Sequence, residues 1–337
     1  MTAAPPRWDE RAARAPGGHV MQSAAWAGIR EAQGWRPLFF QHDLGVALVL
    51  FRSLALGRRF AYVPRGPVTA PGDEHALRAM LAALASVARA EGAMFLKVDP
   101  ERSPAEAEGA LRASGYRRGD DVQPVLATLE LDLTPGEDAL FAGLEKDTRW
   151  SVRQPEKRGV TLREAADERD LRAFYEVYAV TGERAGFVTR TWDYYRLVWR
   201  TLIDAGHATL RVAEHEGAVV AGAMTWHCGA RELYMYGATN DAGRRTYAAY
   251  GLVWESIREA RRRGFRSFDL GGIPTDPNDP RDTMRGPYHF KKGFGGVERR
   301  YVGAHDLVVA ELPYRAFRVL EPAYARVLRA IGSIRRG

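Results

Sequence analysis

The segment that decides the fold lies in the second half of the chain, where residues 231–274 read RELYMYGATNDAGRRTYAAYGLVWESIREARRRGFRSFDLGGIP. The apolar run at 232–238 predicts a strand, and a second strand is predicted at 266–270. Between them we expect a helix that begins after Asn240 and Asp241 and ends at Gly264. One stripe of this helix is aromatic and apolar and consists of Tyr247, Tyr250, Trp254 and Ile257. A strand, a helix and a strand in this order indicate an α/β or α+β domain.

The first half of the chain repeats this plan. A helix with Asp73 as its N-cap is expected to stop at Gly92, and a strand at 93–98 follows directly. Residues 88–92 (ARAEG) and 260–264 (ARRRG) lead into the two corresponding strands in a similar way. The match is short and suggests a duplicated unit. Two such units would form a cleft between them, with polar residues at the strand ends.

A chain of 337 residues is long enough for two cores. We expect a flexible leader at 1–18, a first domain at 19–123, a second domain at 124–312 and an amphipathic helix at 313–337. The terminal helix is expected to pack on the body, although a basic amphipathic helix could also contact a membrane surface. No apolar run reaches the roughly 18 residues that a spanning helix requires. These features predict a cytoplasmic protein, which we expect to be a monomer.

The chain carries 49 Lys and Arg against 42 Asp and Glu, a formal net charge of +7. This balance makes a polyanionic partner plausible, although arginine-rich chains also arise without any role in nucleic-acid binding. The single Cys228 excludes an internal disulfide and a multi-cysteine metal site, and it is interpreted as a buried structural thiol. The eight histidines show no metal-ligand spacing, and the chain has no Walker loop or Gly-x-Ser-x-Gly elbow. No metal is therefore expected.

Polar residues mark the ends of the predicted elements in the second half. Arg244 falls in the first turn of the predicted helix, where backbone N–H groups favour an anion, and Tyr247 follows on the same face. Phosphate recognition is one interpretation and a solvated arginine is the other. In the segment 286–296 aromatic residues alternate with lysines between glycines. One lysine could stabilise an oxyanion in an apolar cleft, or the segment could be a basic surface hairpin.

Two carboxylates occupy corresponding places at strand ends. Asp269 precedes two glycines at the end of one strand, and Asp99 closes the matching strand of the first half, where alternation places Lys97 on the same face. Each carboxylate could bind an amine or could cap backbone N–H groups of a loop.

Several of these segments, in this order and spacing, resemble the Fem family of peptidyltransferases. The matching residues are Gln22, Ser23, Trp26, 64–67 (PRGP), 97–100 (KVDP), Thr148, Arg149, 156–160 (EKRGV), 234–238 (YMYGA), Arg244, Tyr250, 254–255 (WE), 268–274 (FDLGGIP) and 290–296 (FKKGFGG). The resemblance covers about residues 20 to 305.

The resemblance implies two tandem acetyltransferase-like (GNAT) domains, without a coiled-coil arm because the interval 180–209 has no room for one. It implies transfer of Gly, Ala or Ser from aminoacyl-tRNA to the side-chain amine of the stem peptide in a peptidoglycan precursor, either UDP-MurNAc-pentapeptide or lipid II. Aminoacyl-tRNA is then a co-substrate. No cofactor is expected, because aminolysis of an activated ester is downhill.

The resemblance also implies roles for individual residues. Arg30, at a position where the family has a lysine, and Arg244 would hold the diphosphate of the precursor, with Tyr247 and Tyr250 close by.

The remaining implied roles concern the peptide and the ester. Asp99, with Lys97 beside it, would line the peptide site. Lys291 would be the catalytic cation near the scissile ester, and Asp269 or the substrate itself would take the proton.

Two other functions are weighed against this one. A GNAT-type N-acyltransferase would use acyl-CoA or another acyl donor, but residues 241–246 lack the Arg/Gln-x-x-Gly-x-Gly/Ala turn that normally binds the pyrophosphate of coenzyme A. A non-catalytic protein that binds tRNA or another polymer is favoured only by the charge.

Overall fold

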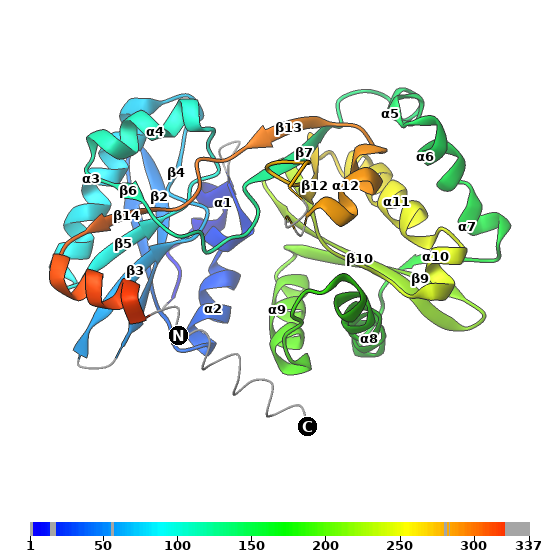
Figure 1. Cartoon of the computed structure of the whole chain (residues 1–337), viewed down its shortest axis with the longest axis horizontal. Helices are drawn as coiled ribbons and strands as arrows, with labels where there is room; N and C mark the ends of the chain where they lie inside the picture. The colour runs from blue at the N-terminus through cyan, green and yellow to red at the C-terminus, as the bar shows by residue number, and fades with distance from the viewer. Residues whose placement is uncertain (1–2, 14–17, 55–56, 280–281, 283, 321–337) are drawn as a thin grey trace.

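The computed structural model describes residues 3–13, 18–54, 57–279, 282 and 284–320. Within them the chain forms two seven-stranded sheets, one for each half, with helices packed against both (Figure 1). Each sheet contains parallel and antiparallel pairs. The fold is therefore mixed α/β and has two units, as the sequence predicts.

The first sheet has the strand order β1-β2-β3-β5-β14-β6, and β4 pairs with β2. Its strands are β1 (Arg36–His42), β2 (Gly45–Ser53), β3 (Arg59–Val63), β4 (Val68–Thr69), β5 (Phe95–Val98), β6 (Arg117–Arg118) and β14 (His305–Val308). The helices of this half are α1 (Trp8–Ala13), the 3-10 turn η1 (Val20–Gln22), α2 (Ala24–Ala32), α3 (Glu74–Ala90) and α4 (Pro104–Ala113).

The second sheet has the order β13-β7-β12-β11-β10-β9-β8. Its strands are β7 (Ala127–Asp132), β8 (Thr161–Glu164), β9 (Ala208–His215), β10 (Ala218–Cys228), β11 (Arg231–Thr239), β12 (Ser267–Gly272) and β13 (Val297–Arg300). The helices of this half are α5 (Glu137–Gly143), α6 (Lys146–Ser151), α7 (Gln154–Lys157), α8 (Glu168–Ala185), α9 (Trp192–Asp204), α10 (Asp241–Arg245), α11 (Ala248–Arg262) and α12 (Arg285–Lys292).

The repeated unit predicted from the sequence is present as β3–α3–β5 and β11–α11–β12. In each unit the two strands pair in parallel, Ala61–Val63 with Leu96–Val98 and Arg231–Leu233 with Ser267–Asp269. Asp73 caps α3 as expected, because its carboxylate accepts a hydrogen bond from the backbone N–H of Ala76 at 2.8 Å.

The helix expected to run from Asn240 to Gly264 is interrupted. Asn240 caps the short α10, and α11 begins only at Ala248. Tyr247 lies between the two helices with φ of +61°, a left-handed conformation that breaks the helical path and is uncommon for a residue other than glycine. Periodicity alone does not reveal such a break, because the apolar stripe continues across it.

The amino-terminal residues differ from the expected flexible leader. Residues 8–13 form α1, in which Trp8 is buried and packs edge-on against Phe39 with ring centroids 4.8 Å apart. The indole N–H of Trp8 donates a hydrogen bond to the carbonyl of Gln22 at 2.7 Å. The expectation of a flexible leader is therefore wrong for this helix, which one large side chain anchors to the body.

The carboxy-terminal part of the chain returns to the first sheet. β14, which falls inside the expected second domain at 124–312, pairs antiparallel with β5 and β6 and so fills the gap between them. Residues 311–320 are helical, and Tyr314 of this helix packs edge-on against Phe95. The rest of the predicted terminal helix, 321–337, lies outside the described residues.

The two halves share a hydrophobic core where α2 approaches the second unit. Trp26 of α2 packs edge-on against Trp226 of β10 with centroids 5.6 Å apart, and both rings belong to one buried cluster that also includes Trp199. Figure 1 shows α2 and α9 facing one another across this junction. Within the residues placed by the structure, no helix is both long and apolar enough to cross a membrane.

Candidate active site

The clearest candidate site lies where β11 and β12 separate. Their parallel ladder ends at Leu233 and Asp269, and β12 then bends through Gly271, whose φ is +75°. A Cβ atom at Gly271 would lie 2.8 Å from the carbonyl oxygen of Tyr234 on β11 and 3.5 Å from Nζ of Lys291. Only glycine therefore fits this bend without displacing its neighbours.

Lys291 reaches this bend from α12. Because residues 285–292 form this helix, the alternative prediction of a basic surface hairpin at 286–296 is wrong. The side chain of Lys291 is buried, and Nζ donates a hydrogen bond to the carbonyl of Gly272 at 2.6 Å. Burial lowers the pKa of Lys291 to about 8, against the opposing effect of the Asp269 carboxylate. The side chain remains mostly cationic near pH 7, in surroundings where a cation strongly stabilises a developing oxyanion.

Asp269 is buried beside this lysine, and both of its oxygens are engaged. Oδ1 accepts hydrogen bonds from the Thr128 hydroxyl and from the backbone N–H of Gly271, the latter at 2.8 Å. Oδ2 lies 3.5 Å from the Arg231 guanidinium. Burial raises the pKa of Asp269, and the Arg231 cation and the Thr128 hydrogen bond oppose that rise. This environment suits a carboxylate that shapes the bend better than one that accepts a proton.

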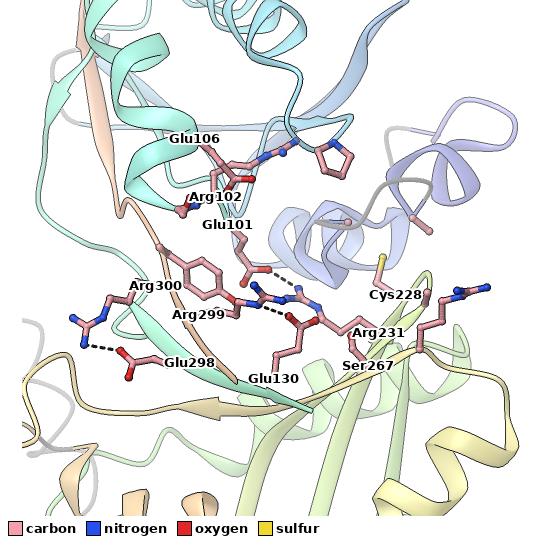
Figure 2. A pocket seen from close by; sticks show the side chains of 17 residues that line it. Glu101, Arg102, Glu106, Glu130, Cys228, Arg231, Ser267, Glu298, Arg299 and Arg300 are labelled. Atoms are coloured by element: carbon pink, nitrogen blue, oxygen red, sulfur yellow. Dashed lines mark hydrogen bonds and ion pairs between the residues drawn. The ribbon is translucent and has the colours of Figure 1, made fainter. Parts of the chain in front are cut away.

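A buried chain of charges continues from Asp269 into the first half. Arg231 contacts both Asp269 and Glu101, and Glu101 also lies 3.6 Å from the guanidinium of Arg65. Figure 2 shows Glu101 and Arg231 pointing toward one another at a cavity of about 810 Å³ between the halves. Cys228 lines the same cavity, and burial raises the pKa of its thiol to about 12. A thiol of that pKa is protonated, which agrees with a structural role.

Sequence reasoning missed three members of this chain. Arg65 and Glu101 fall within or next to the 64–67 and 97–100 segments, so the signal that could have found them was present. Arg231 follows the turn after β10, and nothing in the sequence around it indicates its role. Its partner Glu101 lies 130 positions earlier, and its partner Asp269 lies on the neighbouring strand β12.

Lys97 lies on β5 and Asp99 directly follows that strand, and the two side chains have different partners. Asp99 is buried and accepts hydrogen bonds from the Tyr62 hydroxyl at 2.8 Å and from the Arg65 backbone N–H at 2.5 Å. Burial raises the pKa of Asp99 to about 6, against the opposing Arg65 cation. Lys97 instead pairs with Asp306 of β14, with Nζ 2.7 Å from the carboxylate. The structure therefore uses Lys97 to hold β14 in the sheet and connects only Asp99 to the charge chain.

Arg30 lies on α2 at the junction between the halves. Its guanidinium stands 4.8 Å from the centroid of the Trp35 ring and donates to the Gln33 side chain at 2.8 Å. Burial lowers the pKa of Arg30. The phenol of Tyr194 raises this pKa, and the cation of Arg190 lowers it further. Arg190 stacks over Tyr194, 4.5 Å from its ring centroid. Two cations from different halves thus lie near the junction of α2 and α9.

The structure does not bring Arg30 and Arg244 together. Arg244 is exposed on α10 and bonds to Asp241 at 2.8 Å, and Figure 1 places α10 well away from α2, at the outer side of the second half. Tyr247 lies against Trp150 of α6, and Tyr250 packs edge-on against Phe290 of α12. These residues form a separate surface on the second half, next to α12.

Both halves of the chain are similar to known proteins. The FemAB family model matches residues 7–114, and an acetyltransferase (GNAT) domain model matches residues 144–292. The lipid II:glycine glycyltransferase of Staphylococcus aureus (strain USA300) is 25% identical over an alignment of 390 residues, which covers 91% of this chain and 92% of that protein. The corresponding protein of strain Mu50 is 24% identical with the same coverage.

Solved structures support the fold. A crystal structure of FemX superposes with a TM-score of 0.83 and 22% identity, and covers 94% of this chain and 98% of its own. The C-terminal domain of a putative lysylphosphatidylglycerol synthetase from Agrobacterium fabrum superposes with a TM-score of 0.58 and 16% identity, covering 93% and 95%. With a FemAB match in the first half, a GNAT match in the second and two GNAT-like units in the fold, the chain is similar to the Fem peptidyltransferases over most of its length, and it is an acyltransferase.

Proposed function

We propose that this enzyme transfers Gly, Ala or Ser from aminoacyl-tRNA to the side-chain amine of the stem peptide in a peptidoglycan precursor, UDP-MurNAc-pentapeptide or lipid II. The observation that carries the proposal is the buried ammonium of Lys291 at the opening between β11 and β12. The relatives named lipid II:glycine glycyltransferase support a precursor of this class as the acceptor. The substrates would place the reaction in the cytoplasm.

The chemistry is the aminolysis of an ester. The neutral amine nitrogen attacks the carbonyl carbon of the aminoacyl ester, a C–N bond forms, and the C–O bond to the ribose breaks. The proton that the amine loses ends on the departing ribose hydroxyl, so no external acid or base is consumed. Lys291 stabilises the negative charge that develops on the carbonyl oxygen. Asp269, whose oxygens are engaged, holds the Gly271 bend and supports the charge of the lysine.

The acceptor would lie between the two halves. Arg30 and Arg190 provide two cations for the diphosphate of the precursor, and arginine suits this role because its planar group binds two oxygens at once. Arg190 replaces Arg244 in this assignment, because Arg190 acts on the charge of Arg30, whereas Arg244 is not among the groups that do so. Asp99 lies at the first-half end of the charge chain and would face the peptide.

The reaction can be tested directly. The purified protein is mixed with UDP-MurNAc-pentapeptide or lipid II, a tRNA pool, aminoacyl-tRNA synthetases and isotopically labelled Gly, Ala or Ser, and the mass of the precursor is measured. We expect the mass to increase by one labelled residue with one of the three amino acids, and we expect nuclease treatment of the tRNA to abolish the increase. No increase with any of them would defeat the proposal. An increase with acetyl-CoA alone would favour an ordinary GNAT reaction instead.

A further inference from the structure

The exposed surface around Tyr247 has no place in the acceptor site. Tyr247 contacts Trp150 edge-on with ring centroids 5.1 Å apart, and it contacts Tyr250 at 6.1 Å. Tyr250 in turn packs against Phe290 at 4.8 Å, and Phe290 directly precedes Lys291. These four rings, which we call the aromatic strip, run from the protein surface to α12, the helix that carries the candidate catalytic lysine.

The outer end of the aromatic strip is open to solvent. Trp150 is 49% exposed, so its ring is accessible to a ligand that could stack on it. Tyr247 holds its left-handed backbone conformation although it is not a glycine, and such strain persists where the surrounding structure enforces it, often at ligand sites. The guanidinium of Arg158 stacks on Tyr247, 4.9 Å from the ring centroid.

Cations flank the aromatic strip. Lys146, Arg153, Lys157, Arg158 and Arg245 are all exposed. In the described part of the chain none of these five side chains forms an ion pair, whereas the neighbouring Arg244 is paired with Asp241. Arg158 donates a hydrogen bond to the Arg245 carbonyl at 2.6 Å, which ties α7 to α10. Four carboxylates lie on or directly beside the same helices, Glu145, Asp147, Glu156 and Asp241, and Asp241 is paired with Arg244. The surface therefore combines uncompensated positive charge with exposed aromatic faces.

This combination fits single-stranded nucleic acid, whose bases stack on aromatic rings while its phosphates pair with Lys and Arg. We propose that the aromatic strip and its flanking cations bind the unpaired 3′ end of the donor RNA and lead its terminal ester to Lys291. The inference rests on the proposed function, because it assumes an RNA-linked donor. A duplex offers no free base faces, so the single-stranded end is the part of the RNA that matches the rings.

Three variants separate stacking from charge. Trp150→Ala removes an exposed ring, Tyr247→Gly removes a ring and relieves the positive φ, and Arg153→Gln removes one unpaired cation. Arg112→Gln is the matched control, because Arg112 is an exposed arginine of α4 in the other half. Thermal unfolding of each variant checks that the fold is retained.

The measurements are the KM values for aminoacyl-tRNA and for the precursor, and the affinity for an uncharged hairpin RNA that reproduces the acceptor stem and its unpaired 3′ end. We expect each aromatic variant to raise the donor KM about tenfold while the acceptor KM stays unchanged, in line with the loss of one stacked base. Arg153→Gln should weaken binding of the hairpin and reduce the slope of log affinity against log salt by about one. Arg112→Gln should change neither quantity.

The outcomes distinguish the two proposals. If the wild-type enzyme uses aminoacyl-tRNA but the three variants keep its donor KM and salt dependence, the docking surface is wrong and the proposed function stands. If the wild type transfers nothing from aminoacyl-tRNA and does not bind the hairpin, both fail. If the variants lose affinity for vesicles of phosphatidylglycerol while the donor KM is unchanged, the surface meets a membrane and the RNA assignment is overturned.

Discussion

The guanidinium of Arg231 and the carboxylate of Glu101 form an ion pair between the two halves of the molecule, with 2.5 Å between their nearest nitrogen and oxygen atoms. Both side chains are largely withdrawn from solvent, at 17% and 6% exposure. Burial by itself would raise the pKa of Glu101, but the cations of Arg231 and Arg65 lower it to about 2. Because Arg231 also contacts Asp269, the pair connects the junction of the halves to the Lys291 site.

Removal of one partner of this pair should destabilise the protein. Glu101→Gln removes the carboxylate that Arg231 and Arg65 share, and breaking a buried pair in this way typically costs about 3–5 kcal/mol. We expect a loss of this size in the free energy of unfolding by urea. The double variant Glu101→Gln/Arg231→Met should recover part of it, because the Arg231 cation no longer lies opposite a neutral side chain, although Asp269 then also loses this cation. Equal losses in the single and double variants would contradict this account.

The same pair predicts a pH dependence. The pKa of Glu101 is lower in the folded than in the unfolded chain, so its stabilising effect is present above the ordinary carboxylate range and is lost as the pH falls toward about 2. The difference in unfolding free energy between wild type and Glu101→Gln should therefore shrink as the pH is lowered from about 4.5. Urea titrations of both proteins at several acidic pH values measure this difference. A constant difference would show that the charge of Glu101 is not responsible.

Lys291 should control the alkaline limb of the activity profile. Burial lowers its pKa to about 8, and above that pH the ammonium loses its proton, so kcat should fall as the pH rises through this value. Lys291→Met should lower kcat by about 10²–10³-fold, the usual effect of losing one oxyanion stabiliser. Lys292→Ala is the control, because Lys292 is the exposed neighbour on α12 and should leave kcat unchanged. An alkaline limb that persists in Lys291→Met would assign it to another group.

Sequence reasoning reached the architecture because the repeated unit depends on local signals. The apolar runs, the Asp73 cap and the glycine stops specify β3–α3–β5 and β11–α11–β12 nearly by themselves. The return of β14 to the first sheet could not be read in this way, because it depends on pairing with β5 about 200 residues earlier in the chain.

The candidate site was only partly predictable for the same reason. Lys291 and Asp269 were identified from the segments around them, and the structure brings them together. The pairing of Arg30 with Arg244 was proposed from motif resemblance alone, and the fold separates them. Arg190 was missed because its relation to Arg30 exists only once α9 packs near α2. Local patterns thus identify single residues, whereas partners across the junction require the fold.

Gly271 should be irreplaceable at the bend of β12. Gly271→Ala imposes both a positive φ and a contact of 2.8 Å with the Tyr234 carbonyl, so it should move β12 and the Lys291 hydrogen bond. Gly206→Ala is a matched control, because Gly206 has φ of +72° but faces open space. We expect the control to lose about 1 kcal/mol of stability with an unchanged kcat, and Gly271→Ala to lose more stability and most of its kcat. Equal kcat values in the two variants would contradict the role of the bend.

The two cations at the junction should act on the acceptor and not on the donor. Arg30→Ala and Arg190→Ala should each raise the KM for the precursor by about tenfold or more, since a charge-assisted hydrogen bond contributes about 1.5–3 kcal/mol. Their effects should be less than additive in the double variant if both contact the same diphosphate. Arg244→Ala should leave the precursor KM unchanged, because Arg244 lies on α10, away from the junction of α2 and α9. A precursor KM that responds to Arg244 and not to Arg190 would restore the assignment made from motif resemblance, and would mean that the precursor crosses the second half along a different path.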